Sequence, residues 1–279
     1  MTNRTPASHA GQSSLPFVVH VDSVPDLVDR AQRSPHPREL VLTTVQPHRR
    51  NLRDRLRDAD RPQSSFEFTR LVDVARQVAG TANVETESLD RIDRLRALRS
   101  ILETARDDEA DWYTDLAVSM GTDLPEQPET FEALRAEVET VTGFHPDRLD
   151  ALRSEGNRVP APADRDSRAR IDAVVAAQRA LAARVADAPS SDTVVRNATR
   201  ELAAHGDDTW NEAYGTVERL TVAGAASMSA TLADFLRVLG DETDVDVHLH
   251  LRAATGPDIR ERLSGLCAVA EPGIEVIGS

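Results

Sequence analysis

Strand-forming patterns occur only near the two ends of this chain, and the long stretch between them has helical periodicity alone. Near the N-terminus, short apolar runs alternate with amphipathic segments, the pattern of a parallel sheet covered by helices. The strand-like runs return after about residue 215. We therefore predict an α/β fold, a doubly wound parallel sheet interrupted by a large helical insertion. Strands are expected at Phe17–Val21, Glu39–Val45, Ser65–Phe68, Arg219–Ala223, Val245–Leu251 and Ile274–Ile277.

The predicted helices divide the chain into a sheet domain, residues 15–84 and 216–279, and a helical insertion, residues 85–215. Residues 1–14 are polar and are expected to form a disordered tail. Two prolines and several charges predict a loop at Asn157–Ser167. A helix is expected to begin at Pro47 and to carry Leu52, Leu56 and Ala59 on one face. Further helices are expected at Pro25–Arg33, Arg70–Ala79, Leu89–Thr104, Glu129–Val141, Ala169–Ala186, Ser229–Leu239 and Asp258–Ala268.

The charge composition excludes one large class of enzymes. The 33 basic residues are all arginine, and 47 acidic residues give a net charge of −14. A phosphate loop needs glycines that let backbone N–H groups approach the phosphates and a lysine that reaches the terminal ones. Residues 20–30 (HVDSVPDLVDR), which follow the first strand, contain neither. The chain is therefore not expected to be a conventional Walker-type ATPase, and no cofactor is predicted.

The apolar pattern and the single cysteine predict a soluble, cytoplasmic protein. No apolar run is long enough to cross a bilayer, and the first residues lack the core of a signal peptide. Cys267 has no partner for an intramolecular disulfide and is expected to be buried as a small apolar residue. No membrane partner is expected.

One helical segment departs from the acidic character of the chain. Residues 48–61 (HRRNLRDRLRDADR) contain six arginines against three aspartates. An ordinary solvated helix face with ion pairs at i,i+4 accounts for much of this pattern. Arg49 and Arg50, which come just after a predicted strand, are the residues best placed to bind phosphates.

Histidines and aromatic residues supply two further candidate sites. One strand face carries four polar residues that alternate with apolar ones: Asp244, Asp246, His248 and His250. The two histidines could bind a metal, but no third ligand is identifiable. A solvated strand face is therefore favoured over a metal site. Trp210 and Tyr214, four residues apart on a predicted helix, could stack on bases. Packing inside the protein is the favoured interpretation for them and for Trp112 and Tyr113.

Four segments resemble superfamily I DNA helicases. Residues 39–56 (ELVLTTVQPHRRNLRDRL) and 64–78 (SSFEFTRLVDVARQV) are similar to successive strand–helix elements along the path of single-stranded DNA in those helicases. Residues 218–239 resemble the Walker B strand and helix, and residues 244–253 the strand that follows. Ala223, Gly224 and Ala225 stand where an active helicase has two carboxylates. The loss of both nucleotide-binding motifs resembles the inactivated helicase-like half of AddB and RecC more than an active UvrD-type motor. The arginine-rich, acidic composition resembles that of halophilic archaeal proteins.

The resemblance implies a P-loop-like helicase 1A fold with a 1B-like insertion, in a non-catalytic component of a DNA repair or recombination system. Its expected partners are single-stranded DNA and an active helicase or nuclease subunit. Hydroxyl, amide and guanidinium groups would contact phosphates, and Phe66 would stack on a base or, as we favour, be buried. The implied DNA-binding residues are Thr43, Thr44, Gln46, His48, Arg49, Arg50, Arg53, Ser65, Phe66 and Thr69. No catalytic residue and no metal site are assigned.

Two other functions fit the same sequence. A small-molecule α/β enzyme would place its ligand at the carboxyl ends of the strands. A structural scaffold subunit would share the helicase-like fold and lack DNA affinity.

We predict that the chain does not bind ATP, because phosphoryl transfer depends on a lysine and a magnesium carboxylate that its sequence lacks. Isothermal titration calorimetry with ATP and Mg²⁺ should detect no binding. A dissociation constant in the micromolar range would contradict the prediction.

Overall fold

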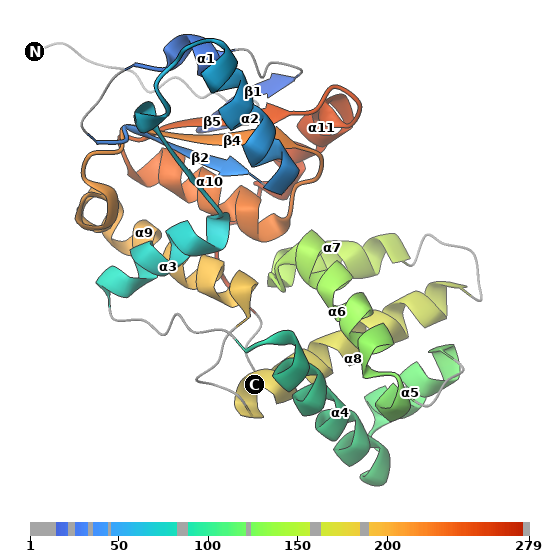
Figure 1. Ribbon diagram of the computed structural model, residues 1–279. Coiled ribbons are helices and arrows are strands. Elements are labelled where there is room, and N and C mark those ends of the chain that lie inside the picture. The colour runs from blue at the N-terminus through green and yellow to red at the C-terminus, as the bar shows by residue number, and fades with distance from the viewer. Residues whose placement is uncertain are drawn as a thin grey trace, which may run out of the picture.

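The computed structural model describes residues 15–21, 26–32, 36–43, 46–82, 89–120, 124–156, 163–184 and 190–275. Within these ranges the chain forms a five-stranded parallel sheet and a separate body of helices (Figure 1). None of the described helices is long and apolar enough to cross a membrane.

The sheet is a single, fully parallel one, as the sequence predicts. Its strands lie in the order β1 (Val18–Val21), β5 (Asp246–Leu251), β4 (Arg219–Ala225), β2 (Glu39–Thr43) and β3 (Phe66–Thr69). The two ends of the chain thus contribute neighbouring strands, because β4 and β5 are inserted between β1 and β2. All the carboxyl ends of the strands lie along one edge of the sheet.

Helices cover both faces of the sheet. One face is packed by α3 (Leu71–Thr81), α9 (Ser191–Tyr214), α10 (Ala230–Glu242) and α11 (Gly256–Leu266), and alternate strand residues such as Leu40, Leu220 and Leu249 join them in the largest apolar core. The opposite face carries α1 (Asp26–Arg30) and α2 (Gln46–Asp58) over a smaller core that contains Val41 and Ala223.

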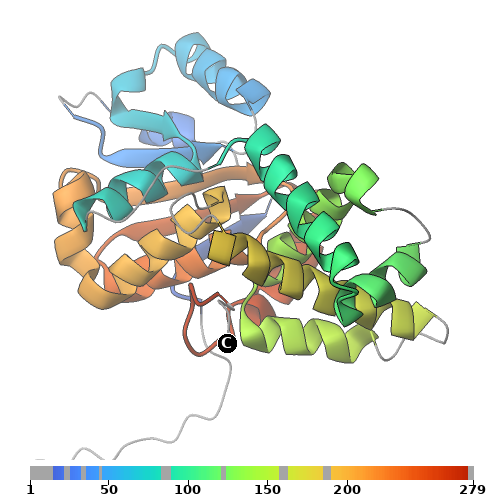
Figure 2. The same cartoon turned by 90° about the horizontal axis from the view of Figure 1, so that it is seen from below.

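The helical body has a core of its own. It comprises α4 (Arg91–Asp107), α5 (Asp111–Met120), α6 (Pro128–Thr142), α7 (Pro146–Gly156) and α8 (Ala163–Arg184), seen beside the sheet in Figure 2. The insertion expected at 85–215 also includes α9, but α9 packs against α3 and α10 and joins the core of the sheet. Within α9, Trp210 is buried with its Nε1 donating to the carbonyl of Val217, so the favoured packing of this residue is confirmed.

Three local predictions differ from the structure. Residues 163–167, expected in a loop, form the start of α8, and residues 157–162 of that predicted loop lie outside the described ranges. Ala59 lies in the exposed turn after α2 and not on its buried face. Ile274 and Glu275 are not in a strand, because Glu275 instead pairs with the buried Arg196; residues 276–277 of that predicted strand lie outside the described ranges.

Buried ion pairs join the helical body to the sheet. Arg148 of α7 makes a two-pronged contact with Asp234 of α10, at 3.0 and 2.5 Å, and also donates to the carbonyl of Leu266. Nearby, Glu139 of α6 pairs with Arg135 and with Arg196 of α9. Burial alone raises the pKa of Glu139, but these two arginines outweigh it and hold the pKa below its usual value. The junction therefore depends on complete pairing of its charges.

We predict that Asp234→Ala destabilises the protein by about 3–5 kcal/mol, because it leaves Arg148 buried without its carboxylate. Urea denaturation should measure the loss. The matched control is Arg96→Ala, which removes an exposed pair with Asp93 and should change the free energy of unfolding by less than about 0.5 kcal/mol. Equal effects of the two substitutions would contradict the structural role of the buried pair.

Candidate nucleic-acid interface

Helix α2 is held on the sheet by one apolar row. Leu52 and Leu56, one helical turn apart, are each only 2% exposed and pack with Val41 and Phe68 of the strands below. Pro47 occupies the first turn, where its missing N–H costs no helical hydrogen bond. The first turn contains no acidic residue, so the positive end of the helix dipole is not neutralised there.

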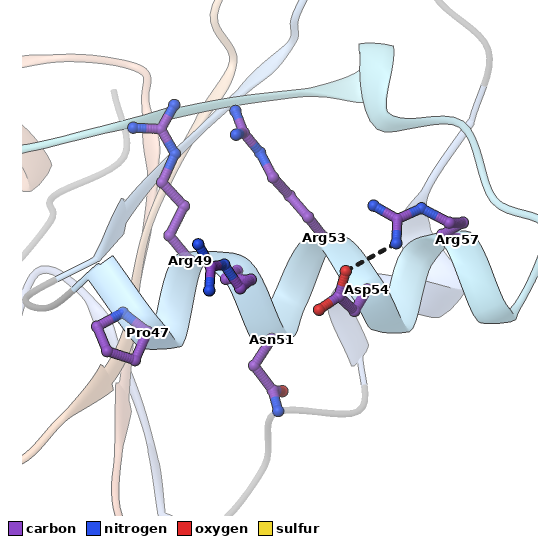
Figure 3. Close-up of a pocket in the computed structure, with 7 residues that line it drawn as sticks. Pro47, Arg49, Asn51, Arg53, Asp54 and Arg57 are labelled. Carbon is purple, nitrogen blue, oxygen red and sulfur yellow. Dashed lines mark hydrogen bonds and ion pairs between the residues drawn. The ribbon is translucent and has the colours of Figure 1, made fainter.

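The outer side of α2 carries an open hollow of about 700 Å³ that arginines line. Figure 3 shows Arg49 and Arg53 extending from the helix toward the same side, with Arg57 one turn further on. The described lining residues all come from this one helix: Pro47, Arg49, Arg50, Asn51, Arg53, Asp54 and Arg57. A molecule bound there would lie along the helix surface and would meet mainly guanidinium groups.

Most of these arginines have no carboxylate partner. Arg57 pairs with Asp54 at 2.9 Å, whereas Arg49, Arg50 and Arg53 form no ion pair with any residue in the described ranges. The explanation by i,i+4 ion pairs therefore does not account for the arginine excess. The guanidinium of Arg53 lies 5.3 Å from the ring centroid of Phe68, a cation–π distance that fixes its position.

The Nε atoms of Arg49 and Arg53 are buried and have no hydrogen-bond partner among the described residues. Buried polar groups are normally satisfied, so these two Nε–H donors are available to an acceptor, although Arg30, Arg94 and Arg196 have a buried Nε in the same state. Carboxylate or phosphate oxygens bind arginine through two parallel hydrogen bonds.

The start of α2 also meets the carboxyl edge of the sheet. His48 lies over Gly224 of β4, where a Cβ would come within 2.7 Å of the imidazole, and Gly224 has a φ of +66°. The strand is irregular here, since the pairing of β4 with β5 shifts between Val222 and Ala225. Arg252, just after β5, donates from Nε to the carbonyl of Gly224 at 2.9 Å.

The pKa of His48 is lowered by its surroundings at this edge of the sheet. Burial lowers the pKa, and the charges of Arg252 and Arg55 lower it further. A lowered pKa keeps the imidazole neutral at pH 7, so the positive charge here comes from arginine. In a chain of net charge −14, this is a local region of positive potential.

The residue set implied by the helicase resemblance is only partly brought together. Arg49, Arg50 and Arg53 share the hollow, and His48 lies on the adjacent side of the helix start. Phe66 is buried in the core beneath α2, so the favoured burial is confirmed. Thr44 and the side chain of Gln46 lie outside what the structure describes.

The three remaining residues offer less surface than the arginines. Thr43 is buried at the end of β2, and Thr69 is half-buried at the end of β3. Ser65 is also buried, and its hydroxyl donates to the carbonyl of Gln32. A hydroxyl contact to DNA from Ser65 would require that bond to break.

Sequence reasoning missed one functional candidate, His20. It lies on β1 in register with His250 of β5, next to His248. The available signal was a polar residue inside the strand run VVHV, but the pairing of β1 with β5 joins residues 228 positions apart. No local pattern records such a pairing.

The parallel sheet with helices on both faces defines an α/β protein of the Rossmann- or P-loop-like class. The sequence model of one family, described as Halobacterial UvrD-like protein, matches residues 5–278. The chain belongs to this family, and its relation to UvrD-type helicases and its halophilic character agree with the resemblance found in the sequence. The comparison with curated proteins found no match.

We predict that Gly224→Ala destabilises the protein by about 1–3 kcal/mol, because the new methyl group meets His48 and the residue keeps a positive φ. The double variant with His48→Ala should recover the steric part of the loss. Gly80→Ala is the control, since nothing lies within 4 Å of a Cβ there and the helix should gain roughly 0.5–1 kcal/mol. Additive effects of Gly224→Ala and His48→Ala in chemical denaturation would contradict the contact.

Proposed function

We propose that the protein is a non-catalytic, helicase-like component of a DNA repair or recombination system that binds or guides single-stranded DNA through α2. The proposed contacts are Arg49, Arg50 and Arg53, with His48 at the start of the helix. Thr43 is buried at the end of β2 and Thr69 is half-buried at the end of β3, whereas Ser65 and Phe66 are buried and serve the fold. An active helicase or nuclease subunit is the proposed partner.

The observation that carries the proposal is that Arg49, Arg50 and Arg53 form no ion pair with any residue that the structure describes. On α4, by contrast, exposed arginines such as Arg96 and Arg99 pair with carboxylates of their own helix. In a chain that is acidic as a whole, three neighbouring arginines without a carboxylate partner in the described ranges form a surface suited to a polyanion. The position of the helix after strand β2 agrees with the resemblance of residues 39–56 to a strand–helix element of superfamily I helicases.

The shape of the surface favours an extended polyanion over a small ligand. The hollow is open and follows one helix, and Arg49, Arg53 and Arg57 recur every four residues, a rise of about 6 Å per step. A repeating row of cations matches a repeating row of phosphates. Contacts of this kind bind the backbone and do not read base sequence.

The non-catalytic part of the proposal is supported by the carboxyl end of β4. Ala223, Gly224 and Ala225 are buried there, and the near contact of His48 with Gly224 leaves no room for a side chain. In the helicase resemblance these positions correspond to the carboxylates that hold magnesium. Together with the missing lysine, this supports an AddB-like, inactivated role.

We predict that the wild-type protein binds a fluorescein-labelled single-stranded oligonucleotide in an anisotropy titration, and that the affinity falls as salt is added. Replacing Arg49, Arg50 and Arg53 together by alanine should weaken binding at least about tenfold. It should also flatten the plot of log affinity against log salt by roughly 2, at about 0.7 per phosphate contact. The titrations are repeated with the partner subunit once one is found.

The matched control replaces Arg96, Arg99 and Arg106 of α4 by alanine, an equal loss of charge on an exposed helix whose arginines are ion-paired. Its DNA affinity should stay within about twofold of wild type if contacts, and not net charge, decide binding. Far-ultraviolet circular dichroism checks that both triple variants are folded. Equal losses in the two variants, or no binding by the wild type alone and in complex, would favour the scaffold function.

A further inference from the structure

A cluster of three histidines lies on the neighbouring strands β1 and β5. Because β1 and β5 are parallel neighbours, His20 is directly opposite His250, and His248 is two residues before His250 on the same face. Nε2 of His20 lies 2.9 Å from Nδ1 of His248. One nitrogen of each ring lies within 4.8 Å of the other two, and no other such group of potential metal ligands occurs in the described parts of the chain.

We propose that His20, His248 and His250 bind one divalent transition-metal ion of the zinc class. Three imidazole nitrogens with water in the fourth position form an open tetrahedral zinc site. Nitrogen ligands favour Zn²⁺, Co²⁺, Ni²⁺ and Cu²⁺ over Mg²⁺ and Ca²⁺, which prefer oxygen. This site is independent of the proposed DNA-binding surface.

The surroundings of His248 support a ligand role. Its Nδ1 faces His20, while its Nε2 lies 3.0 Å from Oδ1 of Asp246, and Arg219 holds that carboxylate from the next strand. Metal-binding histidines commonly direct their second nitrogen to such a carboxylate, which fixes the ring.

The rings must turn for the ion to bind. They are now nearly parallel, with centroids 4.3 Å apart for His20 and His250 and 5.2 Å apart for His20 and His248. A tetrahedral zinc ion with Zn–N bonds of about 2.0–2.1 Å needs nitrogens roughly 3.3 Å apart. Rotation about the side-chain bonds would bring the ring planes to converge on one point, while the strand pairing keeps the three residues together. The ring that donates its proton between His20 and His248 would change tautomer and carry that proton on its other nitrogen, so that both rings bind the ion as neutral imidazoles.

The bound ion would also stabilise the pairing of the edge strand β1. Among the described strands, β1 pairs only with β5, so an ion bound to His20 and to both histidines of β5 cross-links the edge of the sheet. A ligand that binds only the folded state raises the unfolding temperature. Added Zn²⁺ should therefore stabilise the protein.

The experiment uses tag-free protein that has been stripped with a chelator and dialysed. Titration calorimetry with ZnCl₂ should show one ion per chain, Co²⁺ should give the visible absorption of a tetrahedral site, and MgCl₂ should give no binding. His20→Ala and His248→Ala should weaken zinc binding by more than about 100-fold and abolish the thermal shift. Asp246→Asn should weaken it by about 10- to 100-fold through the loss of ring positioning.

The matched control is His205→Ala, which removes an exposed histidine of α9 and should leave zinc affinity unchanged. His20→Gln provides a second variant that keeps a polar side chain if the alanine variant does not fold. Absence of zinc binding by the wild type, or equal affinity in wild type and His20→Gln, would overturn the site and leave the histidines as a packed polar cluster. DNA binding through α2 does not depend on either outcome.

Discussion

The unequal covering of the two faces of the parallel sheet is the constraint on which the rest of the structure depends. One face is packed continuously by four helices around the largest core. On the other face, the described helices α1 and α2 cover the β2 and β3 side, while Val18 and Asp246 on the β1 and β5 side remain exposed. The covered part binds α2 through Leu52 and Leu56, and the β1 and β5 side carries the half-buried His20 and His248 and the buried His250. Both candidate sites follow from this division.

Arginine takes three different roles in a chain that has no lysine. At the junction of the helical body and the sheet, Arg148 and Arg196 are buried and form ion pairs, so they help to fix the geometry of the two parts. On α4, arginines pair with carboxylates of the same helix and contribute little. On α2, Arg49, Arg50 and Arg53 have no such partner among the described residues. The state of pairing, and not the number of arginines, distinguishes the candidate interface from an ordinary charged surface.

The sheet was predictable because its signals are local. Short apolar runs alternating with amphipathic segments marked β1 to β5, and the parallel arrangement followed from the helices between them. Residues 163–167 were misassigned because charge and nearby prolines indicate a loop as readily as the first turn of a helix. Arg49 and Arg53 were found from composition, but their orphaned Nε atoms and the stacking on Phe68 depend on tertiary contacts. His20 could not be joined to His248 without knowing the strand order.

Hydrogen exchange measured by mass spectrometry, with and without a saturating single-stranded oligonucleotide, tests the central claim most directly because it locates the contact. The account predicts slower exchange in residues 46–58 of α2 when DNA is present, and unchanged exchange in residues 91–107 of α4, which is equally rich in arginine. Protection of α4, or binding without any protection of α2, would contradict it.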